Sequence, residues 1–352
     1  MTHDPASASL RSLRTDLPVW AAPMAGGATT PAMVVSAARA GGLGLLASGY
    51  KTADAMAAQI AEVRATGSAF GVNVFAPNPV PVAVRAYRDY GQVLQPEADR
   101  YGLTLPSEQP RNEDDDAWVT KLELLLSDPV PLVSFTFGLP GADVMKALQN
   151  VGTVVAQTVT TSAEALAAAQ IGADVLVVQA PAAGGHSATF SPDRPLDLIS
   201  LPDLVRDVRD ASGLPVYAAG GIATAEDVAD ALRAGAQAVM VGTVLLRTHE
   251  SGASAAHKAA LTDPAFTETT LTHAFTGRPA RGLRNRFTDT YEAFAPLGYP
   301  ALHHLTTGLR KAAAAAGDTD LVHLWAGTGW REAREESVAD ALTRLAAEAP
   351  AS

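Results

Sequence analysis

One histidine near the middle of the chain follows two glycines and a long apolar run. The segment at 179–186 reads Gln-Ala-Pro-Ala-Ala-Gly-Gly-His, and it comes directly after the run 175–180. Imidazole titrates near neutral pH, so a histidine on a flexible glycine turn is suited to moving protons. An arbitrary loop histidine more often makes a structural hydrogen bond, but this placement favours His186 as a catalytic base.

The other seven histidines carry no comparable signal. We expect His249, His257 and His273 at the surface, His3 in the N-terminal tail, and His303, His304 and His323 near a segment that borders the site. No carboxylate has the spacing that would make these imidazoles metal ligands. The sequence therefore predicts no metal site.

Small-residue turns follow the seventh and eighth apolar runs. They are Ala-Gly-Gly-Ile at 219–222 and Gly242-Thr243. Backbone N–H groups at such turns bind phosphate, and barrels favour phosphate sites after strands seven and eight. Glycine also permits a tight turn without any ligand, but the two turns together favour a phosphorylated ligand.

Two amide side chains belong to apolar runs. Asn73 lies inside the run 70–75, and Gln179 lies near the end of the run 175–180. A buried amide must find hydrogen-bond partners or cost stability. The edge of a flavin ring would supply them, as would backbone groups or buried water.

Eight apolar runs must position these residues. They are 19–24, 43–48, 71–75, 130–137, 154–159, 175–180, 216–221 and 238–243, with helical stretches between most of them. Several are apolar throughout, which is typical of parallel strands covered on both faces. The sequence predicts a (β/α)8 TIM barrel. A doubly wound sheet is the alternative, but no G-x-G-x-x-G follows any run.

Two regions interrupt this alternation. Residues 77–128 predict an excursion over the barrel, in which the acidic run 113–116 is the solvated start of a helix at 118–126. Residues 247–316 predict a smaller, mainly helical second domain after the eighth strand. Residues 317–352 then return to the barrel at 1–246 and end in an amphipathic helix at 330–348.

Composition excludes several classes of protein. The 352 residues carry a net charge of -11 and no cysteine, which argues against nucleic-acid binding, disulfides and Fe–S clusters. Residues 1–16 lack the pattern of a secretory signal, and no window reaches the roughly 18 apolar residues of a membrane span. We expect a soluble, cytoplasmic protein without a membrane partner.

These segments resemble the class I nitronate monooxygenases, once called 2-nitropropane dioxygenases, over nearly the whole chain. The matching stretches are 22–27, 40–44, 70–75, 133–140, 179–190, 219–222 and 324–327. The resemblance implies an FMN-binding TIM barrel whose substrate pocket is covered by the smaller domain. It also implies oxidation of a nitronate or nitroalkane by O2 to a carbonyl compound and nitrite.

The resemblance assigns roles to individual residues. It implies flavin contacts at Pro23, Met24, Asn73, Gln179, Gly184, Gly185, Gly220, Gly221, Met240, Gly242 and Thr243, the catalytic base at His186, and a substrate pocket at Tyr299, Arg310 and Lys311. The chain departs from the family at Ala182, Ser187 and Met240, where Glu, a basic residue and Gln are usual. These departures change polarity near the pocket and bear on substrate choice.

Two other functions fit parts of the same pattern. A flavin-dependent enoyl-acyl-carrier-protein reductase shares the barrel and a similar Ala-Gly-Gly-His stretch, but it needs a reduced nicotinamide donor. The segments 134–140 and 325–327 disfavour it. A catalytically silent flavin- or phosphate-binding protein is the alternative of another class.

Overall fold

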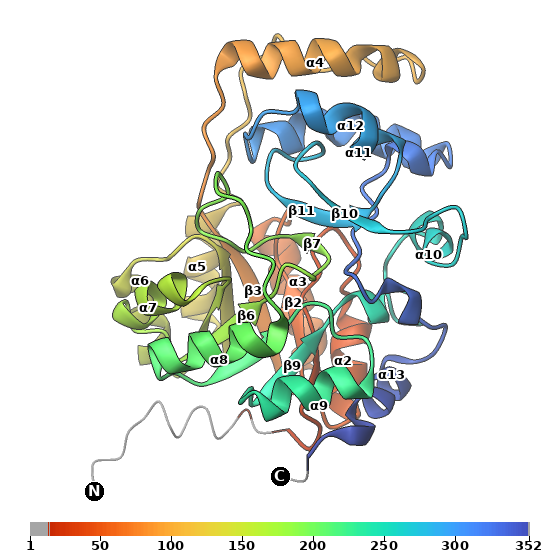
Figure 1. Cartoon of the computed structure of the whole chain (residues 1–352). Helices are drawn as coiled ribbons and strands as arrows, with labels where there is room; N and C mark the ends of the chain where they lie inside the picture. The colour runs from red at the N-terminus through yellow and green to blue at the C-terminus, as the bar shows by residue number, and fades with distance from the viewer. Residues whose placement is uncertain (1–12, 14, 351–352) are drawn as a thin grey trace, which may run out of the picture.

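The computed structural model describes residue 13 and residues 15–350, so His3 and most of the segment 1–16 lie outside the described residues. Eight parallel strands close into a barrel in the order β1-β2-β3-β4-β5-β6-β8-β9. Their bounds are β1 (Val19–Ala21), β2 (Gly44–Ala47), β3 (Phe70–Ala76), β4 (Leu132–Phe137), β5 (Val154–Val159), β6 (Val175–Gln179), β8 (Val216–Ala219) and β9 (Ala238–Val241). Each lies on one predicted run, which confirms the TIM barrel (Figure 1).

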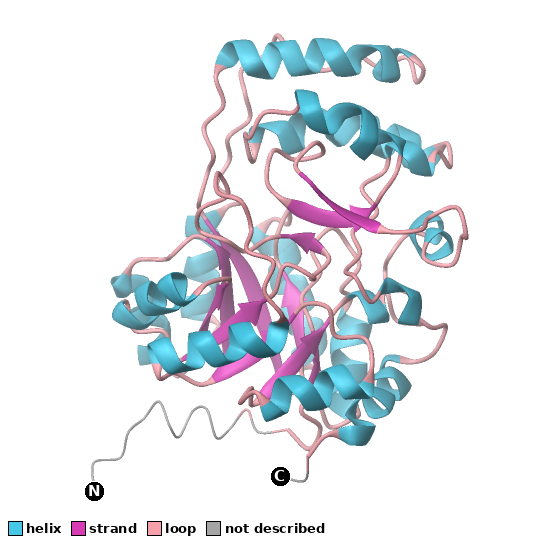
Figure 2. Ribbon diagram, viewed as in Figure 1, coloured by secondary structure: helices cyan, strands magenta, loops and turns pink. Residues whose placement is uncertain are grey.

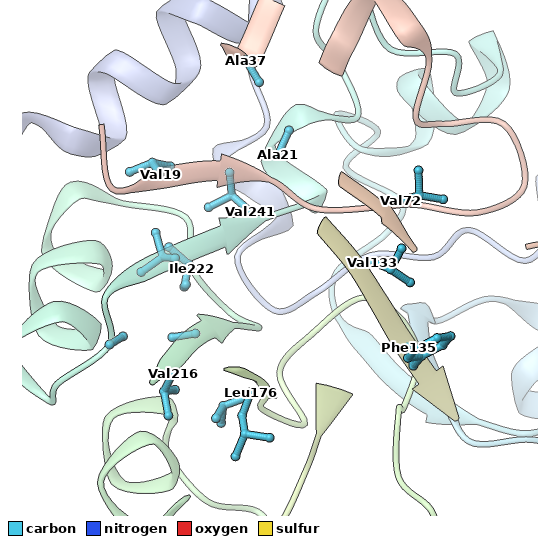
Figure 3. Close-up of a cluster of buried hydrophobic side chains, with 14 of the residues drawn as sticks. Val19, Ala21, Ala37, Val72, Val133, Phe135, Leu176, Val216, Ile222 and Val241 are labelled. Carbon is cyan, nitrogen blue, oxygen red and sulfur yellow. The ribbon is translucent and has the colours of Figure 1, made fainter. Parts of the chain in front are cut away.

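Helices surround the barrel and cover the outer faces of its strands. They are α2 (Pro31–Arg39), α3 (Ala53–Arg64), α5 (Trp118–Ser127), α6 (Ala142–Asn150), α7 (Ser162–Gln170), α8 (Leu201–Ser212), α9 (Ala225–Arg233) and α13 (Val338–Leu345). Figure 3 shows strand residues such as Val72 and Leu176 and helix residues such as Ala37 in one buried cluster. This cover explains why the strands are apolar on both faces.

The alternation of strand side chains sets which residues reach the barrel mouth. In β6, Val175 and Val177 pack inside the barrel, whereas Leu176 packs outward in the cluster with the helices. Successive side chains of a strand point to opposite faces, so Gln179 shares the inward direction of Val177. The same alternation in β3 turns Asn73 inward, because its neighbours Val72 and Val74 are packed outward.

A second layer lies above the barrel (Figure 2). It contains β7 (Gly185–His186), β10 (Thr269–Thr272), β11 (Ala280–Leu283), α10 (Ala255–Ala260), α11 (Arg286–Tyr291), η2 (Glu292–Phe294), α12 (Ala301–Ala315) and η3 (Thr319–Leu321). The expectation of a mainly helical region missed the three-stranded antiparallel sheet β10-β11-β7. Two- and four-residue strands are too short to give a readable alternation. The division of the chain at 246 and 316 stays a prediction.

The excursion covers the second layer, not the barrel as expected. Its long helix α4 (Val84–Asp99) lies above α12 in Figure 1. Tyr90 of α4 is buried in the same apolar cluster as Leu305 of α12, and its hydroxyl donates to the Ala274 carbonyl at 2.7 Å. Only α5 returns to the barrel, where Leu125 joins the outer core.

The acidic run is solvated only in part. Glu113, Asp114 and Asp115 are exposed, but the Asp116 carboxylate lies 2.7 Å from the ammonium of Lys121, whose side chain is 0% exposed. The same ammonium donates to the Ser48 carbonyl at 3.0 Å. The predicted solvated start is therefore wrong for Asp116, because a buried lysine needs a partner.

This ion pair makes a stability prediction. Asp116→Ala should lower the free energy of unfolding by about 3 kcal/mol, because it leaves the Lys121 ammonium buried beside a carbonyl alone. Urea denaturation at pH 7 measures the change. Adding Lys121→Met should recover most of the loss, since the double variant buries no charge. An Asp116→Ala variant as stable as the parent would show that the pair contributes nothing.

The C-terminal segment is less helical than expected. The predicted helix at 330–348 resolves into η4 (Trp330–Glu332), α13 and η5 (Ala346–Glu348). The Ser337 side chain accepts from the Asp340 N–H and caps α13, so the helix begins there. Across the described chain, no helix has both the length and the apolar character needed to cross a membrane.

Candidate active site

A cavity of about 620 Å³ lies at the carboxyl ends of the barrel strands, beneath the second layer. The predicted residues that line it are Pro23, Met24, Asn73, Gln179, Gly184, Gly185, His186, Gly220, Gly221, Met240, Gly242, Thr243, Arg310 and Lys311. Tyr299 does not line it. Of the three departures from the family pattern, Met240 lines the cavity, whereas Ala182 and Ser187 do not. The fold thus brings residues from distant parts of the sequence to one place.

The glycine turns present unused donors to this cavity. The backbone N–H groups of Gly220, Gly221, Gly242 and Thr243 donate to no group within the part of the chain that the structure describes. Gly220 and Gly221 have φ values of +104° and +82°, and a Cβ on Gly220 would lie 2.8 Å from the Ala180 carbonyl oxygen. Only glycine fits there, and a phosphate would satisfy these donors.

The two amides in the strands have different surroundings. The Asn73 amide group donates to the Ser134 and Thr136 hydroxyls at 2.9 Å each, and its Oδ1 accepts no hydrogen bond from the described residues. Gln179 instead holds the next loop: its Nε2 donates to the His186 carbonyl at 3.2 Å and its Oε1 accepts from the Ala188 N–H at 2.8 Å. Asn73 thus keeps a free acceptor at the cavity wall, while Gln179 is mainly tied to backbone.

The imidazole of His186 borders the cavity from β7. Its Nε2 lies 2.9 Å from the Thr276 hydroxyl, and its Nδ1 has no hydrogen-bond partner among the described residues. Burial, and then the charges of Arg278 and Arg310, lower the pKa of His186 to about 3. The ring is therefore neutral at neutral pH and carries a lone pair.

The loop after His186 is held from both layers. The fully buried Arg278 donates to the carbonyls of Ser187 and Thr189. From the barrel side, Glu164 accepts from the Thr189 hydroxyl at 2.9 Å and from a backbone N–H of the same loop. A loop fixed at both sides keeps the His186 ring in one position.

Aromatic rings complete this arrangement. The Arg278 guanidinium lies 4.2 Å from the centroid of the Phe137 ring, and that ring meets His186 edge-on at 5.7 Å. Phe137 has a φ of +81°, a strained conformation for a residue with a side chain. The Tyr299 ring packs against the His186 ring, with 5.6 Å between their centroids, and its hydroxyl donates to the Tyr50 hydroxyl at 3.2 Å. Tyr299 therefore supports two residues that line the cavity without lining it itself.

Arg310 gives the cavity a positive charge. Its guanidinium contacts only neutral groups among the described residues, including the Thr306 hydroxyl at 3.0 Å and the His303 carbonyl at 2.9 Å. Burial lowers its pKa to about 10, which still leaves it protonated at neutral pH. Lys311 also lines the cavity, and none of the described aspartates or glutamates does. The site is therefore suited to an anionic ligand.

The sequence placed one histidine wrongly. His257 was expected at the surface, but it lines the cavity and its Nε2 lies 3.1 Å from the Trp325 carbonyl oxygen. His273 is paired with Glu292 at 2.7 Å, whereas His249 is exposed as predicted. Within residue 13 and residues 15–350, no three acidic or histidine side chains gather closely enough to hold a metal ion.

The buried histidines predict a loss of stability in mild acid. Burial lowers the pKa of His186, His257 and His303 to about 3, 4 and 2, and that of His323 well below its usual value. Between pH 6.5 and 5 these histidines become protonated in the unfolded chain, whereas they stay neutral in the folded protein. The free energy of unfolding should therefore fall by at least about 1 kcal/mol from pH 7 to 5.

His273 opposes this trend, because its bond to Glu292 raises its pKa. Urea denaturation at pH 7, 6 and 5 tests the net effect, in a range above the titration of ordinary carboxylates. His257→Gln should reduce the slope. Stability that holds constant or rises on acidification would contradict the prediction.

Thr276, Arg278 and Tyr50 were not predicted as site residues, and Trp325 was named only as part of the matching segment 324–327. Arg278 sits in an ordinary-looking Gly-Arg-Pro turn, and its fully buried state has no signature in a single sequence. Thr276 lies 90 residues from its partner His186, so no local pattern joins them.

Comparison with known proteins places this site in a family. A family model described as nitronate monooxygenase matches residues 8–348. The chain belongs to the nitronate monooxygenase family. A probable nitronate monooxygenase from Bacillus subtilis (strain 168) is 36% identical over 335 residues, which cover 94% of this chain and 95% of that protein.

Solved structures agree with this membership in the nitronate monooxygenase family. The nitroalkane oxidase from Streptomyces ansochromogenes superposes with a TM-score of 0.90 at 46% identity, over 97% of each chain. FabK from Thermotoga maritima has a TM-score of 0.72 at 24% identity, over 97% of this chain and 95% of that one, a likeness of fold alone. The chain is therefore an enzyme, an oxidoreductase with the fold of its family.

Proposed function

We propose that this family member binds FMN and oxidises nitronates, and the nitroalkanes that give rise to them, with O2 to a carbonyl compound and nitrite. One observation carries the proposal. A single cavity holds a neutral imidazole at His186 and, at the glycine turns, four N–H groups that have no partner among the described residues. These are the groups that a phosphorylated flavin and a proton transfer require.

The residues present fit FMN. The N–H groups of Gly220, Gly221, Gly242 and Thr243 would hold its phosphate, as unpartnered donors at turns hold anions. The free Oδ1 of Asn73 would accept from an N–H on the edge of its ring. Pro23, Met24, Gly184, Gly185 and Met240 would supply apolar and backbone contacts along the same wall. When bound, the flavin supplies the redox chemistry that no side chain of this site can provide.

The chain itself would bind and deprotonate the substrate. A nitroalkane loses a proton from the carbon next to the nitro group, and the neutral His186 ring would take it. The charges of Arg278 and Arg310 oppose a charged imidazole. They would also attract the negative charge that develops on the nitro group, so proton transfer is favoured only with substrate present. Arg310 and Lys311 would draw in a nitronate that is already anionic.

Oxygen uptake by the purified protein tests this proposal. We expect a yellow protein that consumes O2 with a nitronate and releases nitrite, without NADPH. Rapid reduction of the flavin by NADPH in the absence of nitronate would favour the enoyl-acyl-carrier-protein reductase alternative. A colourless protein that binds no added FMN would refute the flavin proposal. A yellow protein that reacts neither with a nitronate and O2 nor with NADPH would favour the silent binding protein. The cytoplasmic location expected from the sequence stays a prediction.

A further inference from the structure

The turn between β10 and β11 places a hydroxyl against the His186 ring. Thr276 is 1% exposed, lines the cavity, and lies with its Oγ1 2.9 Å from His186 Nε2. The same Oγ1 lies 3.3 Å from the Arg278 carbonyl oxygen. Strand pairing between His186 and Ala280 holds the turn in place. The hydroxyl is therefore fixed between a ring nitrogen and a carbonyl.

A hydroxyl has one hydrogen to donate, so these two contacts restrict the histidine. If the Thr276 hydroxyl donates to the Arg278 carbonyl, its oxygen can accept a hydrogen bond from Nε2–H of His186. Both contacts are then hydrogen bonds. If Thr276 donates to Nε2 instead, the carbonyl contact is lost. Nδ1 would then carry a hydrogen, for which the described residues offer no acceptor. The first arrangement satisfies more polar groups, and a carbonyl oxygen can only accept.

We propose that Thr276 is a positioning residue that holds His186 in the tautomer with its proton on Nε2, which leaves the lone pair on Nδ1. The use of that lone pair as the base rests on the proposed function. The tautomer itself does not.

The hydrogen-bond partner of His186 is a neutral hydroxyl, and this keeps the ring able to act as a base. A carboxylate bonded to His186 would stabilise the imidazolium and keep the ring protonated, which would remove the base. The hydroxyl of Thr276 selects the tautomer without adding charge. The charged groups near the ring are Arg278 and Arg310, and both favour the neutral form. Phe137, Tyr299 and Trp325 supply the remaining ring contacts.

The arrangement also serves the protonated state. Once Nδ1 takes a proton, the Nε2–H bond to Thr276 and the Thr276 bond to the Arg278 carbonyl point the same way. Hydrogen bonds in such a chain strengthen one another. No proton has to move along the chain, because each donor keeps its hydrogen.

Nitrogen-15 NMR of histidine-labelled protein tests the tautomer without any substrate. The His186 signals are assigned by their loss in His186→Asn. We expect the parent protein and Thr276→Ser to show a protonated Nε2 and an unprotonated Nδ1, and Thr276→Val to show a mixture or the opposite tautomer. Thr270→Val in β10 is the matched control, since the Leu271 carbonyl is the one partner that its hydroxyl has in the described part of the chain. A parent signal with the proton on Nδ1, or an unchanged signal in Thr276→Val, would overturn the proposal.

A kinetic comparison tests the consequence. In Thr276→Val, kcat/KM for a neutral nitroalkane should fall about tenfold or more, a part of the roughly 10²- to 10⁴-fold that a general base contributes. The value for the preformed nitronate should change less, and Thr276→Ser should restore the nitroalkane rate. If the parent oxidises neither substrate, the proposed function fails while the NMR result still decides the tautomer. If the parent oxidises both and Thr276→Val matches it, the positioning role is wrong.

Discussion

His186→Asn should lower kcat/KM for neutral nitroalkanes by roughly 10²- to 10⁴-fold, the usual contribution of a general base. The asparagine keeps a polar side chain of similar reach, but it cannot accept a proton at neutral pH. Preformed nitronates have already lost that proton, so their oxidation should slow far less. Initial rates of oxygen uptake with a nitroalkane and with its nitronate, measured side by side, give the two effects.

The variant must keep its flavin for this comparison to be meaningful. The groups proposed to hold FMN are backbone N–H groups and Asn73, and none of them bonds to the imidazole, so His186→Asn should keep its flavin and a visible spectrum like that of the parent. His249→Asn is a matched control, because His249 is exposed and does not line the cavity. Equal losses on both substrates, with full flavin occupancy, would contradict the assignment of His186 as the base.

Gly242→Ala should weaken FMN binding by roughly 10- to 100-fold, the equivalent of one charge-assisted hydrogen bond. Gly242 has a φ of -119°, which alanine adopts without strain. The new methyl group would lie 3.4 Å from the Met24 sulfur, an ordinary contact. The protein alone therefore has room for it, and we expect the methyl to crowd the phosphate instead.

Fluorescence titration of the flavin-free variant measures this loss, and its thermal melting without FMN should equal that of the parent. Gly308→Ala in α12 is the matched control, because its new methyl would meet nothing within 4 Å and the residue does not line the cavity. Gly220→Ala would be a poorer test, since a Cβ there collides with the Ala180 carbonyl. Unchanged FMN affinity in Gly242→Ala would place the phosphate elsewhere.

The barrel and its mouth could be predicted because their signals are local. The run 154–159 is mainly apolar and every residue in it is buried, which follows from a strand covered on both faces, and it matches β5 residue for residue. Glycine turns after β8 and β9 were visible for the same reason. The alternation along β3 and β6 then brings Asn73 and Gln179 to the cavity without further information.

The second layer could not be predicted in the same way, because distant pairs create its features. Arg278 is a charged residue with no local sign of burial, and its contacts reach back about 90 residues. Asp116 belongs to an acidic run that is typical of a solvated surface, yet it pairs with the buried Lys121. The contact of Gln179 with a flavin stays a prediction, but its two bonds to the loop of His186 had no local sign in the sequence. In each case the partner, not the residue itself, decides the role.

A crystal structure of the protein purified with its native ligand tests the proposed arrangement most directly. We expect FMN in the cavity, with its phosphate on the N–H groups of Gly220, Gly221, Gly242 and Thr243 and its ring between Asn73 and the imidazole of His186. A cavity that contains no flavin, a phosphate bound away from both glycine turns, or an imidazole turned away from the ring would contradict it.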